Sequence, residues 1–189
     1  MLSIFLDLID EQSDKDLFEE LYNKYEKSMW YLAYLILEDY HRAEDATQDT
    51  FLNIAIHIKT LRGNEPNKIR NYLLTAVRNR AYDMLRKESK LKYASADCLD
   101  NIYDKRTSNE IENYETNDLA IKILKQMSPT YTDVMYMHLI LGMSNKDIAK
   151  VLKRRYGTVT TQISRGHEMF YELYEKELNK QWHTNTMSF

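Results

Sequence analysis

The stretch SNKDIAKVLKRRYGTVTTQISRG, residues 144–166, decides the fold of the second half of the chain. Ser144, followed three residues later by Asp147, is typical of a capped helix start. The apolar residues that come next recur at helical spacing: Ile148, Ala149 and Leu152. After a break at residues 153–156, a last helix is expected from about Thr158 to Lys180. The pattern therefore predicts two helices joined by a tight turn.

This arrangement is that of a helix-turn-helix, whose second helix enters the major groove of DNA. The residues expected in the turn and on the outer face of the second helix carry basic, hydroxyl or amide groups. Such groups neutralise phosphates or bond base edges. The residues are Arg154, Arg155, Thr158, Thr160, Thr161, Gln162 and Arg165. An ordinary helical hairpin with a solvated face has the same spacing, and the pattern alone leaves both interpretations open.

Composition predicts an all-α protein. The 189 residues include only four Gly and two Pro, and 43% of them are hydrophobic, which is enough for a packed core. A single cysteine, Cys98, excludes an internal disulfide framework and suits a reducing cytoplasm. No apolar run approaches the ~18 residues of a membrane span, and the N-terminus does not resemble a signal peptide. We therefore expect a cytoplasmic protein without stable membrane insertion.

Apolar periodicity divides the chain into two small helical domains joined by a flexible linker. Helices are expected over residues 14–37, 41–61 and 69–90, with a loop at 62–68. The core stripe of the first helix is expected to include Leu17, Leu21, Tyr25, Ser28, Leu32 and Leu35. Residues 91–117 are polar, acidic and without period. The predicted domains are therefore 1–90 and 118–189, with 91–117 as the linker.

Positive charge is concentrated in one part of this acidic chain. The net charge is −3, yet residues 62–92 hold nine Lys or Arg against three Asp or Glu. The outer face of the helix there mixes cations, an amide and an aromatic ring: Arg78, Asn79, Tyr82, Asp83, Arg86 and Lys87. Single-stranded nucleic acid suits such a face, because bases stack on aromatic rings and the backbone follows positive charge. The alternative is a helix that its charges merely keep soluble.

A second stripe lies beside the core stripe of the helix over residues 41–61. It combines acidic, amide and apolar residues at helical spacing: Asp45, Gln48, Asp49, Leu52 and Ile56. A mixed acidic and apolar stripe often marks the surface that meets a protein partner. The alternative is a solvent-facing side, against which the two apolar members argue only mildly.

Three passages, in this order, resemble bacterial RNA polymerase sigma factors of the extracytoplasmic-function type. HRAEDATQDTFLNI (41–54) resembles the helix that binds the polymerase clamp, and NYLLTAVRNRAYDMLRK (71–87) resembles the promoter-melting helix. MSPTYTDVMYMHLILGMSNKDIAKVLKRRYGTVTTQISRG (127–166) is similar to the domain that reads the upstream promoter element. Two departures from the family pattern are Tyr72 in place of Trp, and Lys153-Arg154-Arg155 in place of a Gly, an apolar residue and a Ser.

The resemblance implies a subunit that binds core RNA polymerase, directs it to promoter DNA and assists melting. The 45–56 stripe would then meet polymerase, the basic helix would hold the separated downstream element, and the last helix would read the upstream element. The loop 62–68 would help hold a base that is turned out of the stack. An anti-sigma factor is a further partner that the resemblance allows, and the sequence does not identify one.

Two other functions remain to be weighed against this one. A stand-alone helix-turn-helix regulator would account for residues 128–175 but would leave the first ninety unexplained. A helical enzyme would need converging catalytic groups, whereas the five histidines are scattered and no glycine-rich phosphate loop is present. We therefore expect no catalytic residue, no cofactor and no metal site.

Overall fold

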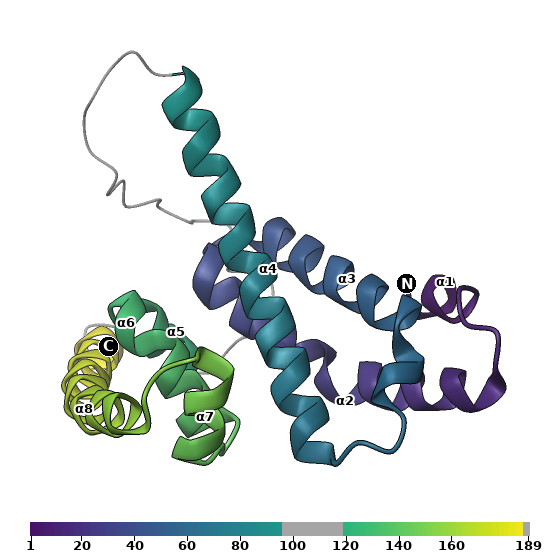
Figure 1. The fold of residues 1–189 in the computed structure, drawn as a ribbon. Coiled ribbons are helices and arrows are strands. Elements are labelled where there is room, and N and C mark those ends of the chain that lie inside the picture. Colours follow the sequence, from purple (N-terminus) through teal and green to yellow (C-terminus); the bar gives the residue numbers. More distant parts are fainter. Residues whose placement is uncertain (96–118, 187–189) are drawn as a thin grey trace. The chain divides into compact units, whose positions relative to one another are not determined.

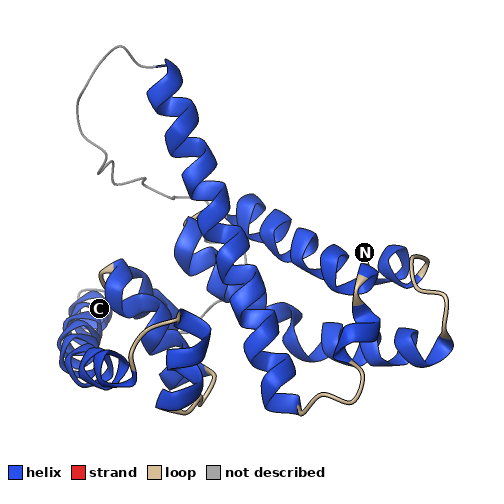
Figure 2. Cartoon of the chain, viewed as in Figure 1, coloured by secondary structure: helices blue, strands red, loops and turns tan. Residues whose placement is uncertain are grey.

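The computed structural model describes residues 1–95 and 119–186, and every regular element within these ranges is a helix (Figure 1, Figure 2). The helices form two compact units, one before and one after the undescribed segment. The predicted all-α fold with two helical units is therefore confirmed. The predicted linker, 91–117, lies almost entirely outside the described residues, and the exact domain boundaries stay a prediction.

The first unit is built around α2 (Gln12–Leu37), which packs against both α3 (Tyr40–Ile56) and α4 (Pro66–Ser95). A short helix that was not predicted, α1 (Leu2–Leu6), contacts α2 and α3. The 3-10 helix η1 (Ile58–Leu61) follows α3 after His57, within the range predicted as one helix.

The buried face of α2 differs from the predicted stripe at two positions. Phe18 and Met29 are fully buried, whereas the predicted core residues Leu17 and Ser28 are only partly buried. The larger apolar side chains gain more from burial than their neighbours, and they set the rotation of the helix. Phe18 packs edge-on against Phe51 of α3, with ring centroids 5.9 Å apart.

The connection between η1 and α4 is shorter than the predicted loop of residues 62–68. Proline suits the first position of a helix because its fixed φ matches and its missing N–H is not needed there. α4 accordingly begins at Pro66, and it continues past residue 90 to Ser95. Only residues 62–65 remain as a loop, and all four are exposed.

The second unit consists of short helices packed on one long one. α5 (Leu119–Gln126) and α6 (Pro129–Met135) are followed by a π-helical turn, η2 (Tyr136–Ile140). α7 (Asn145–Leu152) and α8 (Tyr156–Thr186) come next, and α8 contacts α5, α6 and α7. The core of this unit gathers residues from all of these elements: Ile123, Leu124, Met135, Met137, Ile148 and Val159.

The helix starts of the second unit follow the sequence signals to different degrees. Ser144 caps α7 as predicted, because its hydroxyl accepts a hydrogen bond from the N–H of Asp147 at 3.1 Å. Ser128 stands at the start of α6, but its side chain makes no capping bond. Its carbonyl instead accepts from the N–H of Tyr131 and of Thr132. Gly142 lies between η2 and α7 in the left-handed conformation that glycine favours after a helix, with a φ of 58°.

Candidate protein and nucleic-acid interfaces

The mixed stripe predicted over residues 45–56 lies on the outer side of α3. Asp39 caps this helix by accepting from the N–H of Arg42 at 2.9 Å, which fixes where its turns begin. On the inner side, Thr50 is buried and bonds back to the carbonyl of Ala46. On the outer side, Leu52 is 40% exposed and Ile56 is 61% exposed. Two large apolar side chains are therefore presented to solvent.

Neighbouring side chains hold two polar members of this stripe in place. Asp49 accepts a hydrogen bond from Nε of Arg80 on α4 at 2.8 Å. Gln48 donates to Glu44, one turn earlier, at 3.0 Å. Asp45 is exposed. Sequence reasoning missed Arg80, because a cation inside a basic stretch gives no sign that it pairs with a carboxylate 31 residues earlier.

The basic helix carries its predicted residues on one side of α4. The guanidinium of Arg78 lies 4.6 Å from the centre of the Tyr82 ring, which is a cation–π contact. Arg86 pairs with Asp83 at 3.2 Å, and Asn79 and Lys87 are exposed. Cations, an amide and an aromatic ring thus share one solvent-facing surface, which suits the phosphates and base faces of a single strand.

The loop that leads into α4 is held by a cluster of charges at its first residue, Arg62. This guanidinium bonds the carboxylate of Asp14, which is 0% exposed, and that of Glu11 at 2.5 Å. Lys59 also pairs with Glu11, at 3.3 Å. The hydrogen bond from Arg62 lowers the pKa of Asp14, and burial opposes this shift. Hydrogen bonds from Arg62 and Lys59 lower the pKa of Glu11.

The predicted recognition helix is the first part of α8, which begins at Tyr156, two residues earlier than expected. Thr158 and Arg165 are exposed on it. Thr160 and Thr161 are exposed too, and their hydroxyls donate to the carbonyls of Tyr156 and Gly157 within the helix. With the hydroxyl protons used there, these oxygens face outward as hydrogen-bond acceptors.

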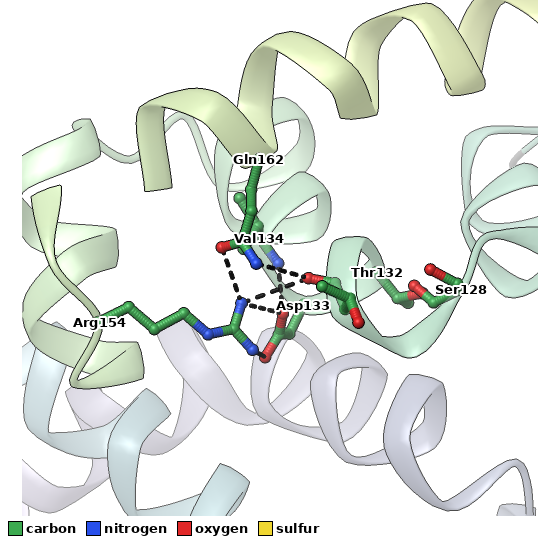
Figure 3. A network of polar contacts seen from close by, with 7 residues as sticks. Ser128, Thr132, Asp133, Val134, Arg154 and Gln162 are labelled. Atoms are coloured by element: carbon green, nitrogen blue, oxygen red, sulfur yellow. Dashed lines mark hydrogen bonds and ion pairs between the residues drawn. The ribbon is translucent and has the colours of Figure 1, made fainter. Parts of the chain in front are cut away.

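The turn before α8 has an unexpected arrangement (Figure 3). Lys153 adopts the left-handed conformation, with a φ of 52°, where the family pattern has a glycine. Arg154 then points into the unit and pairs with Asp133 of α6 at 3.2 Å. Gln162 of α8 accepts a hydrogen bond from Arg154, also at 3.2 Å. Of the predicted contact residues in the turn, Arg155 is exposed and Arg154 is only partly exposed.

Two further properties concern the described residues as a whole. No group of three or more His, Cys, Asp or Glu side chains in the described ranges is placed to hold a metal ion. Within the same ranges, no helix has the length and apolar character needed to cross a membrane.

Both units match models of one protein family. Residues 21–91 match the model described as sigma-70 region 2, and residues 118–168 match that of sigma-70 region 4. The first match contains the α3 stripe and the basic face of α4, and the second contains the helix-turn-helix. The two matches follow the order of the passages on which the resemblance was recognised.

Three bacterial relatives match this chain over 84–90% of its length. The ECF RNA polymerase sigma factor SigW of Bacillus subtilis is 25% identical over 169 residues, which is 84% of this chain and 89% of that protein. SigM of the same organism is 19% identical over 161 residues, covering 85% of this chain and 97% of that protein. SigE of Mycolicibacterium smegmatis is 23% identical over 176 residues, 90% of this chain and 66% of that protein.

Solved structures share the fold. The sigma factor RpoE of Bartonella quintana, in a co-crystal with the anti-sigma factor NepR, superposes with a TM-score of 0.64 at 20% identity. The match covers 85% of this chain and 98% of that one. CnrH, in complex with the cytosolic domain of CnrY, has a TM-score of 0.54 at 18% identity, covering 84% of this chain and 88% of that one.

Proposed function

We propose that this chain, which belongs to the extracytoplasmic-function group of the sigma-70 family, divides promoter recognition between its two units. The chain is a sigma factor and not a stand-alone regulator, because the region 2 match accounts for the half that a lone helix-turn-helix leaves unexplained. Sigma factors are binding subunits of RNA polymerase and direct it to promoters. The residues that carry each contact in this chain are the subject of the proposal.

Core polymerase binds the outer stripe of α3, made of Asp45, Gln48, Asp49, Leu52 and Ile56. The exposure of Leu52 and Ile56 on a helix whose inner side is already packed carries this assignment. Exposed apolar side chains flanked by acids are typical of a surface that a protein partner covers. Partnership with core polymerase also places the chain in the cytoplasm. Because one solved relative was crystallised with an anti-sigma factor, we include such a protein among the proposed partners.

The polymerase contact is tested by replacing Asp45 with Arg and Gln48 with Ala. The double variant should bind purified core polymerase at least about tenfold more weakly in a titration, because it reverses one charge and removes one amide at the contact. Glu20→Arg is the matched control, since it makes the same charge reversal at an exposed position of α2. Equal affinities of wild type, double variant and control would reject the α3 stripe as the interface.

The two DNA contacts are assigned to separate elements. The exposed face of α4, with Arg78, Asn79, Tyr82, Asp83, Arg86 and Lys87, holds the separated strand of the downstream element. The loop at residues 62–65 frames a captured base. In the second unit, Arg155, Thr158, Thr160, Thr161 and Arg165 contact the duplex of the upstream element. What supports this division is that α4 combines an aromatic ring with cations, whereas the start of α8 presents hydroxyl oxygens and arginines.

Strand capture is tested by Asn79→Ala combined with Arg86→Ala. Both side chains are exposed, so the fold and core polymerase binding should be preserved. Promoter opening should fall at least about tenfold, seen as loss of permanganate-reactive thymines, because contacts that only the melted strand makes have been removed. A promoter supplied already melted should partly restore transcripts. Normal opening by the double variant would mean that this face is only a solvated one.

A further inference from the structure

Arg154 and Gln162, which the sequence pattern assigns to DNA, are bound to the body of the second unit (Figure 3). Nη1 of Arg154 donates to Oδ1 of Asp133 at 3.2 Å, and Nη2 donates to Oδ2 at 3.2 Å. Nη1 also lies 3.3 Å from the carbonyl oxygen of Thr130. The guanidinium thus meets the carboxylate through two parallel hydrogen bonds, the geometry in which arginine binds a carboxylate most firmly.

The same network reaches the recognition helix. Oε1 of Gln162 accepts from Nη1 of Arg154 at 3.2 Å, and Nε2 of Gln162 lies 3.5 Å from the carbonyl oxygen of Thr130. Three elements therefore meet at one guanidinium: α6 through Thr130 and Asp133, the turn through Arg154, and α8 through Gln162. The contact fixes the start of α8 relative to α6.

The network is internal. Asp133 is 2% exposed, and the side chain of Arg154 is 23% exposed. A carboxylate that is removed from water must be compensated by a cation or by hydrogen bonds. Asp133 also accepts from the N–H of Val134 at 2.8 Å, so both of its oxygens are engaged. Turning Arg154 outward to a phosphate would remove the two hydrogen bonds that its guanidinium donates to this buried carboxylate.

The backbone of the turn directs Arg154 inward. The left-handed conformation of Lys153 ends α7, and the N–H of Arg154 then closes the helix by donating to the carbonyl of Ala149 at 3.0 Å. The residues on either side of Arg154, which are Lys153 and Arg155, are exposed. The turn thus separates one inward cation from two outward ones.

We propose that Arg154 and Gln162 are positioning residues, which hold the recognition helix at its working angle through Asp133, while Lys153 and Arg155 supply the positive charge that DNA meets. This inference rests on the proposed role of α8 in reading the upstream element. According to this proposal, promoter specificity depends on the contact of Arg154 with Asp133 and Gln162, which lies inside the second unit. The promoter sequence is then read only when the buried ion pair is intact or is replaced by a packed equivalent.

The test compares Arg154→Leu, Asp133→Leu and the double variant. Apolar residues of similar size often replace a buried ion pair without loss, whereas each single change removes one member of the pair and leaves the other in place. The double variant also preserves the net charge of −3. Arg155→Leu is the matched control, with the same loss of charge at the neighbouring exposed position. Holoenzyme binding is measured against a duplex that the wild-type holoenzyme selects from a randomised library, over a range of salt concentrations.

Each single variant should bind the selected duplex about tenfold more weakly, and the double variant should return to within about threefold of wild type, because neighbouring changes of this kind are strongly coupled. The double variant should also keep the wild-type salt slope, whereas Arg155→Leu should lower that slope by about one. Gln162→Ala should weaken binding without changing the preferred sequence. A double variant that stays weak with its slope lowered by about one would overturn the proposal, because Arg154 would then contact a phosphate.

A second measurement separates this inference from the proposed function. Hydrogen exchange in the full-length chain should be at least about tenfold faster across α7 and the start of α8 in each single variant, and near wild type in the double variant. If wild-type holoenzyme selects no duplex, the proposed function fails, and hydrogen exchange still reports whether the network holds α8. Exchange unchanged in the single variants would overturn the positioning role by itself.

Discussion

Each unit of this protein fixes a connection with a buried aspartate and an arginine. In the first unit, Asp14 of α2 binds Arg62, at the start of the loop before α4. In the second unit, Asp133 of α6 binds Arg154, in the turn before α8. The side chain of Arg62 is 42% exposed and is shared with Glu11, whereas that of Arg154 is 23% exposed and is shared with Gln162.

The difference teaches that the same pair of residues can serve two purposes. Around Arg62 a second acid and a second cation, Glu11 and Lys59, share the charge at the surface, where water can replace part of what is lost. Around Arg154 the remaining partners, Thr130 and Gln162, belong to α6 and α8, so the contact ties the turn to two helices. We therefore regard the first pair as an anchor for a loop and the second as an internal joint.

The largest expected difference concerns stability. Arg154→Ala removes one member of a buried ion pair and should lower the free energy of unfolding of the second unit by about 3 kcal/mol. Arg62→Ala should weaken the first unit by less, because the charge of Lys59 still acts on Asp14 and because Arg62 itself is 42% exposed. Hydrogen exchange of the slowest amides in each unit of the full-length chain measures both losses separately. Arg165→Ala, an exposed arginine of α8, is the control and should change stability by no more than about 0.5 kcal/mol. Equal losses in the two units would contradict the distinction.

The pH dependence of stability should further distinguish the Asp14–Arg62 pair from the Asp133–Arg154 pair. The pKa values of Asp14 and Glu11 are lowered in the folded chain, chiefly by hydrogen bonds from Arg62. The stability that these bonds supply is therefore present above the unfolded pKa values of about 4 and is lost as pH falls through the lowered values. In Arg62→Ala, Lys59 still lowers the pKa of Asp14 through its charge and that of Glu11 through a hydrogen bond, while burial raises both, so acidification should cost the variant less stability than it costs wild type.

Urea titrations between pH 3 and 7, followed through the amide signals of α2, measure this contrast. Wild type should lose stability below about pH 4, and the variant should lose less of it over the same interval. If both proteins show the same slope, the short contacts of Arg62 contribute nothing to the stability of the first unit.

The sequence predicted the helices well, but it did not predict the ion pairs that hold the connections between them. Periodicity placed the long helices of the first unit and the two helices on either side of the turn, because one buried stripe repeats along each of them. At Leu17 the stripe was off by one residue, since the neighbouring Phe18 is also apolar and is larger; at Ser28 the stripe included a polar residue, whereas the adjacent Met29 is the buried one. Helical spacing cannot decide between two adjacent apolar registers.

An ion pair between residues far apart in the sequence produces no periodic pattern that could reveal it. Arg154 and Asp133 are 21 residues apart, and Arg62 and Asp14 are 48 apart. The pattern of the turn therefore gave three adjacent cations, of which Arg154 and Arg155 were expected to contact DNA, and no sign that Arg154 faces inward. The signal that was available was Asp133 itself, an acid within a stretch otherwise rich in apolar residues. A buried acid implies a partner but does not name it.

The smallest expected effect concerns the end of one helix in each unit. At both ends a residue other than glycine adopts the left-handed conformation. Glu38 ends α2 with a φ of 54°, and Lys153 ends α7 with a φ of 52°. Glycine adopts this conformation without steric cost. Although glycine also gains freedom in the unfolded chain, Glu38→Gly and Lys153→Gly should each stabilise their own unit by about 0.5–1 kcal/mol.

The two glycine variants should differ only when DNA is present. Lys153→Gly removes a cation beside the recognition helix, so the salt slope of holoenzyme binding to a selected duplex should fall by about one. Glu38→Gly should leave that slope unchanged. Lys153→Asn completes the comparison, because asparagine tolerates the left-handed conformation and carries no charge. It should reproduce the lower slope with a smaller gain in stability. A normal slope in both Lys153 variants would show that the turn reaches DNA through Arg155 alone.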